Sequence, residues 1–189
     1  MAETAKLQLF VKASEDGESV GHCPSCQRLF MILLLKGVPF TLTTVDTRRS
    51  LDVLKDFAPG SQLPILLYDG DAKTDTLQIE EFLEETLGPP EFPSLAPRYR
   101  ESATAGNDVF HRFSAFIKNP APAQDDGEAG GGSPRPQTVC AHFRGAPIPA
   151  QLCGVRRYLD SALRQKEFKY TCPHSSEILA AYRPVVHPR

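Results

Sequence analysis

The stretch CPSCQRLFMILLLKG, residues 23–37, combines a C-x-x-C pair with the beginning of an apolar helix. Pro24 suits the first turn of that helix, and Gly37 stands just past its expected end. Strand-like segments lie on both sides of it, KLQLFVK at Lys6–Lys12 and the β-branched FTLTTV at Phe40–Val45. The sequence therefore predicts a helix that connects two strands.

The segments that follow extend this pattern. Leu51–Phe57 offers one or two helical turns, and PILLY at Pro64–Tyr68 predicts a short buried strand. Asp69–Gly70 is a hairpin signal, Ala72–Thr74 returns as a strand, and Leu77–Leu87 closes with a helix. The order β-α-β-α-β-β-α is the thioredoxin arrangement. The candidate core residues of the closing helix are Leu77, Ile79, Phe82, Leu83 and Leu87.

The second half of the chain is less regular. We expect a thioredoxin/glutaredoxin-like α/β domain over 1–88, a proline-rich linker over 89–97, and a shortened all-α domain over 98–189. Within it, 119–136 is a Gly/Pro-rich tract that cannot build a core and is expected to be flexible. Helices are predicted over Arg98–Lys118, Ala150–Lys166 and Ser175–Tyr182, the second with Leu152, Val155, Leu159 and Leu163 on one side.

The composition of the chain limits the partners and the cellular location that we expect. A formal net charge of −2 and a pI near 6.2 give no global field that would recruit nucleic acid, so no nucleic-acid partner is expected. The N-terminus lacks a basic-then-apolar layout, and five cysteines without a signal argue for a reducing compartment. The longest apolar run, Leu29–Leu35, is far below the ~20 residues of a spanning helix. We expect a cytoplasmic protein, with the nucleus as a further location.

The chemistry is predicted at Cys23. A thiol at a helix N-terminus faces unpaired N–H groups and the positive end of the helix dipole. In such settings the thiol pKa falls from ~8.5 into roughly the 3.5–7.5 range. Cys26 lies one turn further on, close enough to resolve a mixed disulfide formed at Cys23. These two cysteines are the predicted catalytic residues.

Other interpretations of the C-x-x-C pair are open. It is half of many zinc sites, and His22 could add a ligand, but no second C-x-x-C or H-x-x-x-H pair completes four ligands. No metal is therefore expected. Chance spacing of two buried cysteines is the other alternative, against which the strand–loop–helix context counts. The remaining cysteines, expected to be buried and inert, are Cys140, Cys153 and Cys172.

Two further pieces suggest a glutathione site. In thioredoxin-like domains the proline that opens the third strand, here Pro64, lies beside the active thiol, and the backbone of the preceding residue, here Leu63, pairs with glutathione. A plain strand-start proline is the alternative, and the bond before it can be cis. Asp75 or Thr76 can cap the next helix, and the same helix N-terminus can hold the charged γ-glutamyl end of glutathione.

A family resemblance joins these motifs. The stretch Cys23–Arg49, with PGSQLP at Pro59–Pro64 and TDTLQIEEFL at Thr74–Leu83, closely resembles the chloride intracellular channel proteins. The resemblance implies a glutathione-transferase-like fold and glutaredoxin-like thiol–disulfide exchange with glutathione as co-substrate. It also implies conditional membrane association and chloride conduction through the segment Cys26–Val45. Many members carry serine in place of Cys26, so a dithiol route is open here that they lack.

The chain departs from that family in its helical half. The central portion is absent, the tract Asp125–Pro136 stands in its place, and only the later part of the central helix survives, as Thr138–Arg144. We therefore expect the helical domain to have lost its core.

Three functions compete: a glutathione-dependent oxidoreductase acting on disulfide substrates, a membrane-inserted chloride channel, and an interaction module without turnover. Insertion of Cys26–Val45 would bury Arg28 and Lys36 at a cost of ~2.5–3.5 kcal/mol for each charge at the bilayer centre. In the folded state we expect both to be solvated at the margins of a helix whose apolar residues pack on the sheet. Those apolar residues are Leu29, Phe30, Ile32, Leu33 and Leu34.

Overall fold

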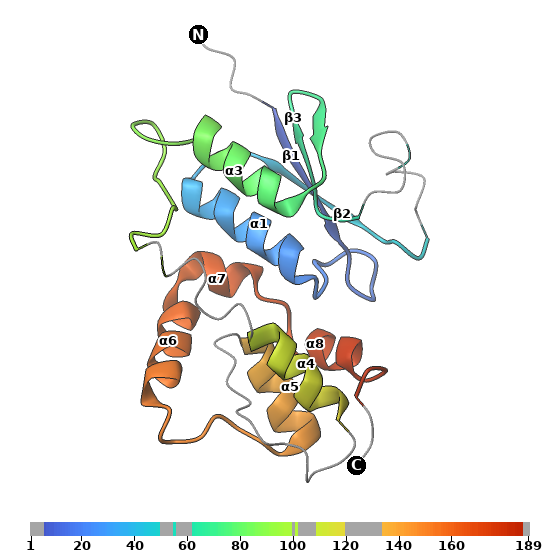
Figure 1. Cartoon of the computed structure of the whole chain (residues 1–189). Coiled ribbons are helices and arrows are strands. Elements are labelled where there is room, and N and C mark those ends of the chain that lie inside the picture. The colour runs from blue at the N-terminus through green and yellow to red at the C-terminus, as the bar shows by residue number, and fades with distance from the viewer. Residues whose placement is uncertain are drawn as a thin grey trace. The chain divides into compact units, whose positions relative to one another are not determined.

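The computed structural model describes residues 6–49, 55, 62–99, 101, 109–119 and 134–186. The chain divides into two compact units (Figure 1). The first comprises Met1–Ala96 with Tyr170–Pro173, and the second Pro97–Lys169 with His174–Arg189.

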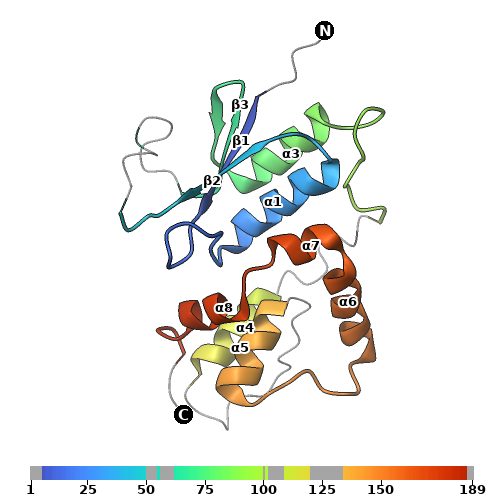
Figure 2. The ribbon, with the colours of Figure 1, turned by 180° about the vertical axis from the view of Figure 1, so that it is seen from behind.

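The first unit is built on a four-stranded mixed sheet with the order β2-β1-β3-β4. Its strands are β1 (Leu7–Lys12), β2 (Thr41–Val45), β3 (Ile65–Tyr68) and β4 (Asp71–Lys73). β1 pairs with β2 in parallel, whereas β1 with β3 and β3 with β4 are antiparallel. Helix α1 (Pro24–Lys36) connects β1 to β2, and α3 (Thr76–Thr86) follows β4 (Figures 1 and 2). The expected thioredoxin-like α/β fold is confirmed.

Strand alternation divides the buried side chains between the two faces of this sheet. On one face Leu7, Leu9 and Val11 of β1 join Leu66 of β3 in a core shared with both helices. The helical members of that core are Cys26, Leu29, Phe30, Leu33, Ile79 and Leu83. The other face buries Phe10, Val45, Ile65 and Leu67. Helices α1 and α3 therefore cover the same face of the sheet, as Figures 1 and 2 also show.

Local signals set the element ends as expected. Gly37 adopts the left-handed conformation (φ 66°) and its N–H bonds to the carbonyl of Leu34, which ends α1. Asp69 (φ 49°) and Gly70 (φ 88°) form the tight turn between β3 and β4. The expectation that Leu77 belongs to the core is wrong, since this residue is 67% exposed. The helical turns expected over Leu51–Phe57 lie outside the described residues except for Lys55, which is helical.

The second unit is helical. It contains α4 (Val109–Lys118), α5 (Pro134–Arg144), α6 (Cys153–Arg164), α8 (Ser175–Tyr182) and most of the short α7 (Lys166–Thr171), which was not expected. The helix expected over Arg98–Lys118 does not include Arg98 and Tyr99, which are not helical; α4 is the part of it that the structure describes as α-helix, and 102–108 lie outside the described residues. Most of the tract 119–136 lies outside them too.

A small core survives in this unit, so the expected loss of the core is wrong. Its buried residues come from α4, α5 and α8 and are Phe113, Ile117, Val139, Cys140 and Ile178. The apolar side of α6 differs from expectation: Leu159 is buried, but Leu152 and Leu163 are 41% and 45% exposed. Across the parts of the chain that the structure describes, no helix combines the length and hydropathy needed to cross a membrane.

Candidate functional site

Cys23 is the N-cap residue of α1. Its backbone is extended (φ −62°, ψ 118°), and its Sγ accepts a hydrogen bond from the N–H of Cys26 at 3.5 Å. Its own carbonyl accepts the first helical bond, from Gln27 N–H at 3.0 Å. The sulfur therefore lies where the unpaired N–H groups and the positive end of the helix dipole favour a negative charge. This is the placement that the sequence predicted for Cys23.

Cys26 is fully buried one turn further along α1. Its Sγ accepts from the backbone N–H of Lys12 at 3.4 Å. The hydrogen bond between the two thiols, reinforced by burial, raises the pKa of Cys26 far above its ordinary value. Neither of these two cysteines forms a disulfide. The raised pKa favours the protonated thiol at Cys26, beside the Cys23 sulfur.

The loop that leads into Cys23 is tightly paired with β1. Ala13 and Val20 form a β-bridge, and Gly21 N–H donates to the carbonyl of Lys12 at 2.8 Å. A Cβ placed on Gly21 would lie 2.5 Å from the Ala13 carbonyl oxygen, closer than any side chain tolerates. Glycine is therefore required at the point where the chain turns toward Cys23.

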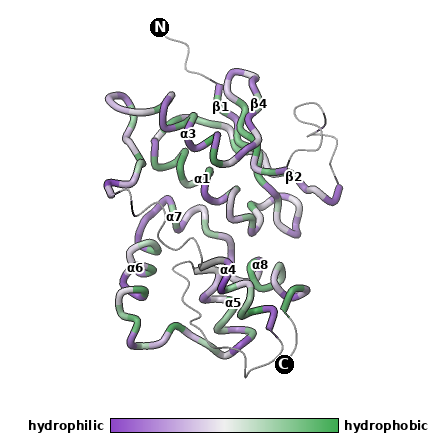
Figure 3. The backbone as a smooth tube through the Cα atoms, viewed as in Figure 1, coloured by the Kyte–Doolittle hydropathy of each residue, from purple (hydrophilic) through white to green (hydrophobic). Residues whose placement is uncertain are grey.

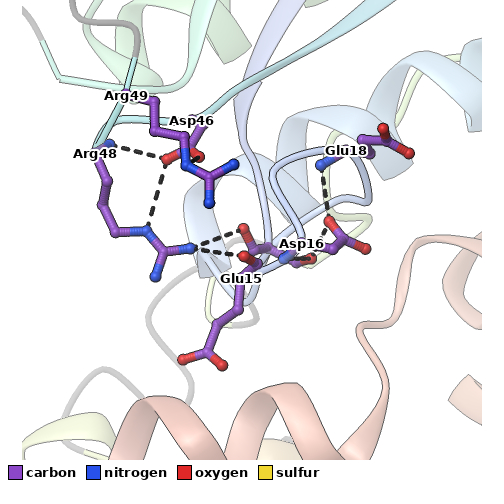
Figure 4. Close-up of polar contacts among 7 residues, drawn as sticks. Glu15, Asp16, Glu18, Asp46, Arg48 and Arg49 are labelled. Atoms are coloured by element: carbon purple, nitrogen blue, oxygen red, sulfur yellow. Dashed lines mark hydrogen bonds and ion pairs between the residues drawn. The ribbon is translucent and has the colours of Figure 1, made fainter.

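A polar clamp joins this loop to the end of β2 (Figure 4). The Arg48 guanidinium donates to the carbonyl of Glu15 at 2.9 Å and lies 3.6 Å from the Asp46 carboxylate. The same carboxylate pairs with Arg49, also at 3.6 Å. No motif marked these residues in the sequence. The Asp16 carboxylate accepts hydrogen bonds from the side chains of Ser14 and Ser19 and from the N–H groups of Glu18 and Ser19. These donors hold the pKa of Asp16 well below its ordinary value.

Leu63 and Pro64 lie at the same end of the sheet as the two thiols. Ile65 pairs with Phe10, so in this antiparallel ladder the preceding Pro64 falls opposite Val11. By the same register Leu63 falls opposite Lys12, whose N–H reaches Cys26. The Leu63–Pro64 peptide bond is cis, Pro64 is fully buried, and Leu63 and Cys23 pack against the same core.

The start of α3 reaches this end as well. Asp75 is its N-cap and accepts from Gln78 N–H at 2.9 Å, so the expected helix cap is present, and Thr76 is the first helical residue. Lys73, the last residue of β4, pairs with Leu66 of the antiparallel β3, so α3 begins at the end of the sheet where β3 starts, just after Leu63 and Pro64 in the sequence. A forked ion pair between Arg28 and Glu80, with contacts of 2.6 and 2.7 Å, holds the first turns of α1 and α3 together. All six predicted site residues therefore gather at one end of the sheet.

Lys36 contradicts the sequence-based expectation that it is solvated. Its side chain is 1% exposed, and Nζ lies 2.9 Å from a Glu84 carboxylate oxygen. Nζ also donates to the carbonyls of Leu87 at 2.7 Å and Pro93 at 3.2 Å. Buried charges persist when they are paired and fully hydrogen-bonded, and here Glu84 of α3 and the segment after α3 supply the oxygens.

The Glu84 carboxylate completes this arrangement. It accepts from the Ser94 hydroxyl and from Leu95 N–H as well as from Lys36. Burial by itself would raise the pKa of Glu84, but these donors outweigh it and hold the pKa at about 2. We call Lys36, Glu84 and Ser94 the linker clamp. It ties the ends of α1 and α3 to the proline-rich segment.

The other cysteines differ in exposure. Cys140 is buried in the helical unit, which raises its pKa to about 11, and Cys172 is partly buried. Cys153, at the start of α6, is exposed, so the expectation that all three are buried is wrong for it. Among the described side chains, no group of three or more His, Cys, Asp or Glu residues is arranged to hold a metal ion.

Comparison with known proteins identifies the family. Residues 5–90 match the family model described as the CLIC-like N-terminal domain. The chain is 68% identical over 237 residues to chloride intracellular channel protein 3 of Homo sapiens and of Mus musculus, covering 100% of both sequences in each case. The chain belongs to the chloride intracellular channel family. Since the aligned length exceeds the 189 residues present here, these family members carry residues that this chain lacks.

Solved structures add the fold of the whole chain. Dehydroascorbate reductase of Chlamydomonas reinhardtii superposes with a TM-score of 0.79 at 18% identity, covering 97% of this chain and 100% of that one. The chloride intracellular channel homologue EXC-4 of C. elegans gives 0.76 at 18% identity, covering 96% and 82%. A rice glutathione transferase solved with glutathione gives 0.67 at 16% identity, covering 95% and 96%. The glutathione-transferase-like fold expected for this family member is confirmed.

Proposed function

We propose that the protein is a glutathione-dependent, glutaredoxin-like thiol–disulfide oxidoreductase whose nucleophile is Cys23. The observation that carries the proposal is the set of hydrogen bonds at its sulfur. That sulfur accepts the N–H of Cys26 at 3.5 Å at a helix N-terminus, and it is hydrogen-bonded to the buried Cys26 thiol, whose pKa is raised. Donors and dipole together stabilise a thiolate, which is the attacking species in disulfide exchange.

The reaction begins on a mixed disulfide between glutathione and a substrate. The Cys23 thiolate attacks the glutathione sulfur, the disulfide bond breaks, and the substrate leaves as a thiolate that takes up a proton. The product is a disulfide between Cys23 and glutathione. A second glutathione thiolate then attacks the glutathione sulfur of this intermediate, releasing oxidised glutathione and restoring the Cys23 thiolate. In the net reaction one free glutathione thiol enters the new disulfide, with the glutathione that was bound to the substrate as its partner, and the substrate sulfur is reduced to a thiol.

Cys26 offers a second exit from the same intermediate. After losing its proton it would attack the Cys23 sulfur, form the Cys23–Cys26 disulfide and release reduced glutathione. Burial and a strongly raised pKa work against that step. We therefore assign the glutathione route as the main one. The dithiol route would serve substrates that remain joined to Cys23 as a mixed disulfide.

Glutathione would bind along the end of the sheet that holds these thiols. The backbone of Leu63 would pair with its peptide part, beside Pro64. The N-terminus of α3, at Thr76, would receive its carboxylate, and Asp75 its ammonium group. Asp75 is exposed, and one of its oxygens accepts from Gln78, which leaves the other for a ligand. The rice glutathione transferase of similar fold, solved with glutathione, supports this choice of co-substrate.

The test is reduction of a glutathionylated peptide, with oxidised glutathione measured through glutathione reductase and NADPH. Cys23→Ser should abolish turnover because the attacking thiolate is gone. Cys26→Ser should retain glutathionyl transfer and lose mainly the reduction of intramolecular protein disulfides. Equal loss in both variants would contradict the assigned roles. Folded wild-type protein without turnover would favour an interaction module instead.

Chloride conduction is the second candidate, favoured by the name of the relatives at 68% identity. The segment Cys26–Val45 is folded here into α1 and β2, and it includes the buried Lys36. Insertion would have to break the linker clamp and expose the core side of α1. We therefore propose that membrane association, where it occurs, follows opening of the first unit.

A further inference from the structure

The helical unit holds a cavity that the proposed chemistry does not use. Its volume is about 310 Å³, at the lower end of the roughly 300–1,000 Å³ typical of small-molecule sites. It lies between the start of α5, the loop before α6, and α6 itself. Its apolar walls are Pro147, Ile148, Leu159 and Leu163, and its polar lining residues are Gln137, Arg156 and Asp160.

The apolar side of α6 is only partly covered, so part of the cavity wall is exposed apolar surface. Both Leu159 and Leu163 line the cavity, and their side chains are 3% and 45% exposed, respectively. Hydrophobic and hydrophilic residues alternate along this helix (Figure 3). Covering an apolar wall that is open to solvent with an apolar group is favourable, because it removes apolar surface from water.

Arg156 gives the cavity a positively charged group. One of its terminal nitrogens donates to the carbonyl of Ile148 at 2.8 Å, which fixes the guanidinium at the cavity wall. A guanidinium carries five N–H donors, so most remain for a ligand. Among the described side chains it forms no ion pair with Asp160. Asp160 places a negative charge in the same lining, but with the exposed Arg157 and Arg164 the net charge of α6 is positive.

We propose that this cavity binds an anionic amphiphile, a single carboxylate head on an apolar chain. The chain covers Leu159 and Leu163, and the carboxylate pairs with the Arg156 guanidinium, which matches two carboxylate oxygens with its forked donors. A neutral apolar ligand would leave the arginine unused, and a hydrophilic anion would leave the apolar walls uncovered. The same chemistry is available from a free medium-chain fatty acid in solution and from a fatty acid held in a bilayer.

Decanoate below its micelle concentration is the probe, titrated into the full-length protein by calorimetry. Arg156→Gln should weaken binding about tenfold or more, because a charged hydrogen bond is lost. The matched control Arg157→Gln removes the same charge from the same helix outside the cavity and should change the affinity less than about twofold. Leu163→Gln should weaken binding severalfold, whereas Leu152→Gln, equally exposed but outside the cavity, should not.

Each remaining outcome has a defined meaning. No saturable binding of decanoate overturns the proposal, as does equal weakening by the two arginine variants, which would indicate general electrostatic attraction. Decanol binding as tightly as decanoate removes the role of the carboxylate and overturns it as well. Flotation with phosphatidylcholine vesicles that contain oleic acid, reversed by free decanoate, supports a bilayer source of the same ligand. Vesicle or acidic-peptide binding without decanoate binding would show a surface contact instead. Circular dichroism of every variant identifies loss of binding that results from unfolding.

Discussion

Replacing Lys36 by methionine should destabilise the first unit more than the replacement of a lysine usually does. Methionine keeps the length and the apolar stem but removes an ammonium group that contacts three oxygens. Breaking a fully buried ion pair by removing one partner costs about 3–5 kcal/mol. The Glu84 side chain is 30% exposed and keeps its bonds from Ser94 and Leu95, so the cost falls toward that of a charged hydrogen bond. We expect a loss of about 2–3 kcal/mol.

The assay is urea unfolding followed by far-UV circular dichroism, since the chain has no tryptophan. With an m value of about 1.5 kcal/mol/M, the urea midpoint should fall by about 1.3–2 M. Arg28→Met is the matched control: it breaks an ion pair on the same helix, but Arg28 is 63% exposed, and such pairs contribute about 0–1 kcal/mol. If Lys36→Met costs no more than Arg28→Met, the linker clamp does not stabilise the fold and this reasoning is refuted.

The pH dependence of the linker clamp follows from Glu84. Its pKa is about 2 in the folded protein, against 4.5 as the reference value for the unfolded chain. A lowered folded-state pKa means that its contribution is complete above pH 4.5 and is lost as the pH falls through that value toward 2. Wild type should therefore lose stability relative to Glu84→Gln only in that acidic window. A difference that already declines near neutral pH would contradict the assigned pKa.

Three other predictions address the site and the membrane. Asp75→Asn keeps the helix cap but removes the charge, so glutathione affinity, measured by calorimetry, should fall about tenfold or more, and an unchanged affinity would exclude the proposed ammonium contact. Gly21→Ala should cost about 1–3 kcal/mol and slow exchange at Cys23, because its Cβ would clash with backbone, whereas Gly154→Ala, with open space around it, should be neutral or stabilising. Liposome flotation at neutral and acidic pH, with reduced and oxidised protein, should show binding through 26–45 only when the first unit opens; strong binding by folded, reduced protein at neutral pH would show that opening is unnecessary.

Sequence alone was sufficient where a signal and its effect lie within a few residues of each other. Pro24 and Gly37 mark both ends of α1, because a proline fits the first turn and a left-handed glycine ends the last. Asp69 and Gly70 form the predicted turn for the same reason. The position of Cys23 at a helix N-terminus followed from these local signals, and so did the thiol chemistry proposed for it.

Tertiary structure alone decided which side chains are covered and by what. The sequence predicts that Lys36 is a solvated residue at a helix end. Its oxygen partners come from residues about fifty positions away, and the periodicity of the helix does not reveal them. Arg48 likewise reaches a loop that precedes it by more than thirty residues. Leu163 repeats at helical spacing with Leu159, yet only Leu159 is buried. Periodicity shows which residues share a side of a helix, whereas burial depends on whether another segment packs there.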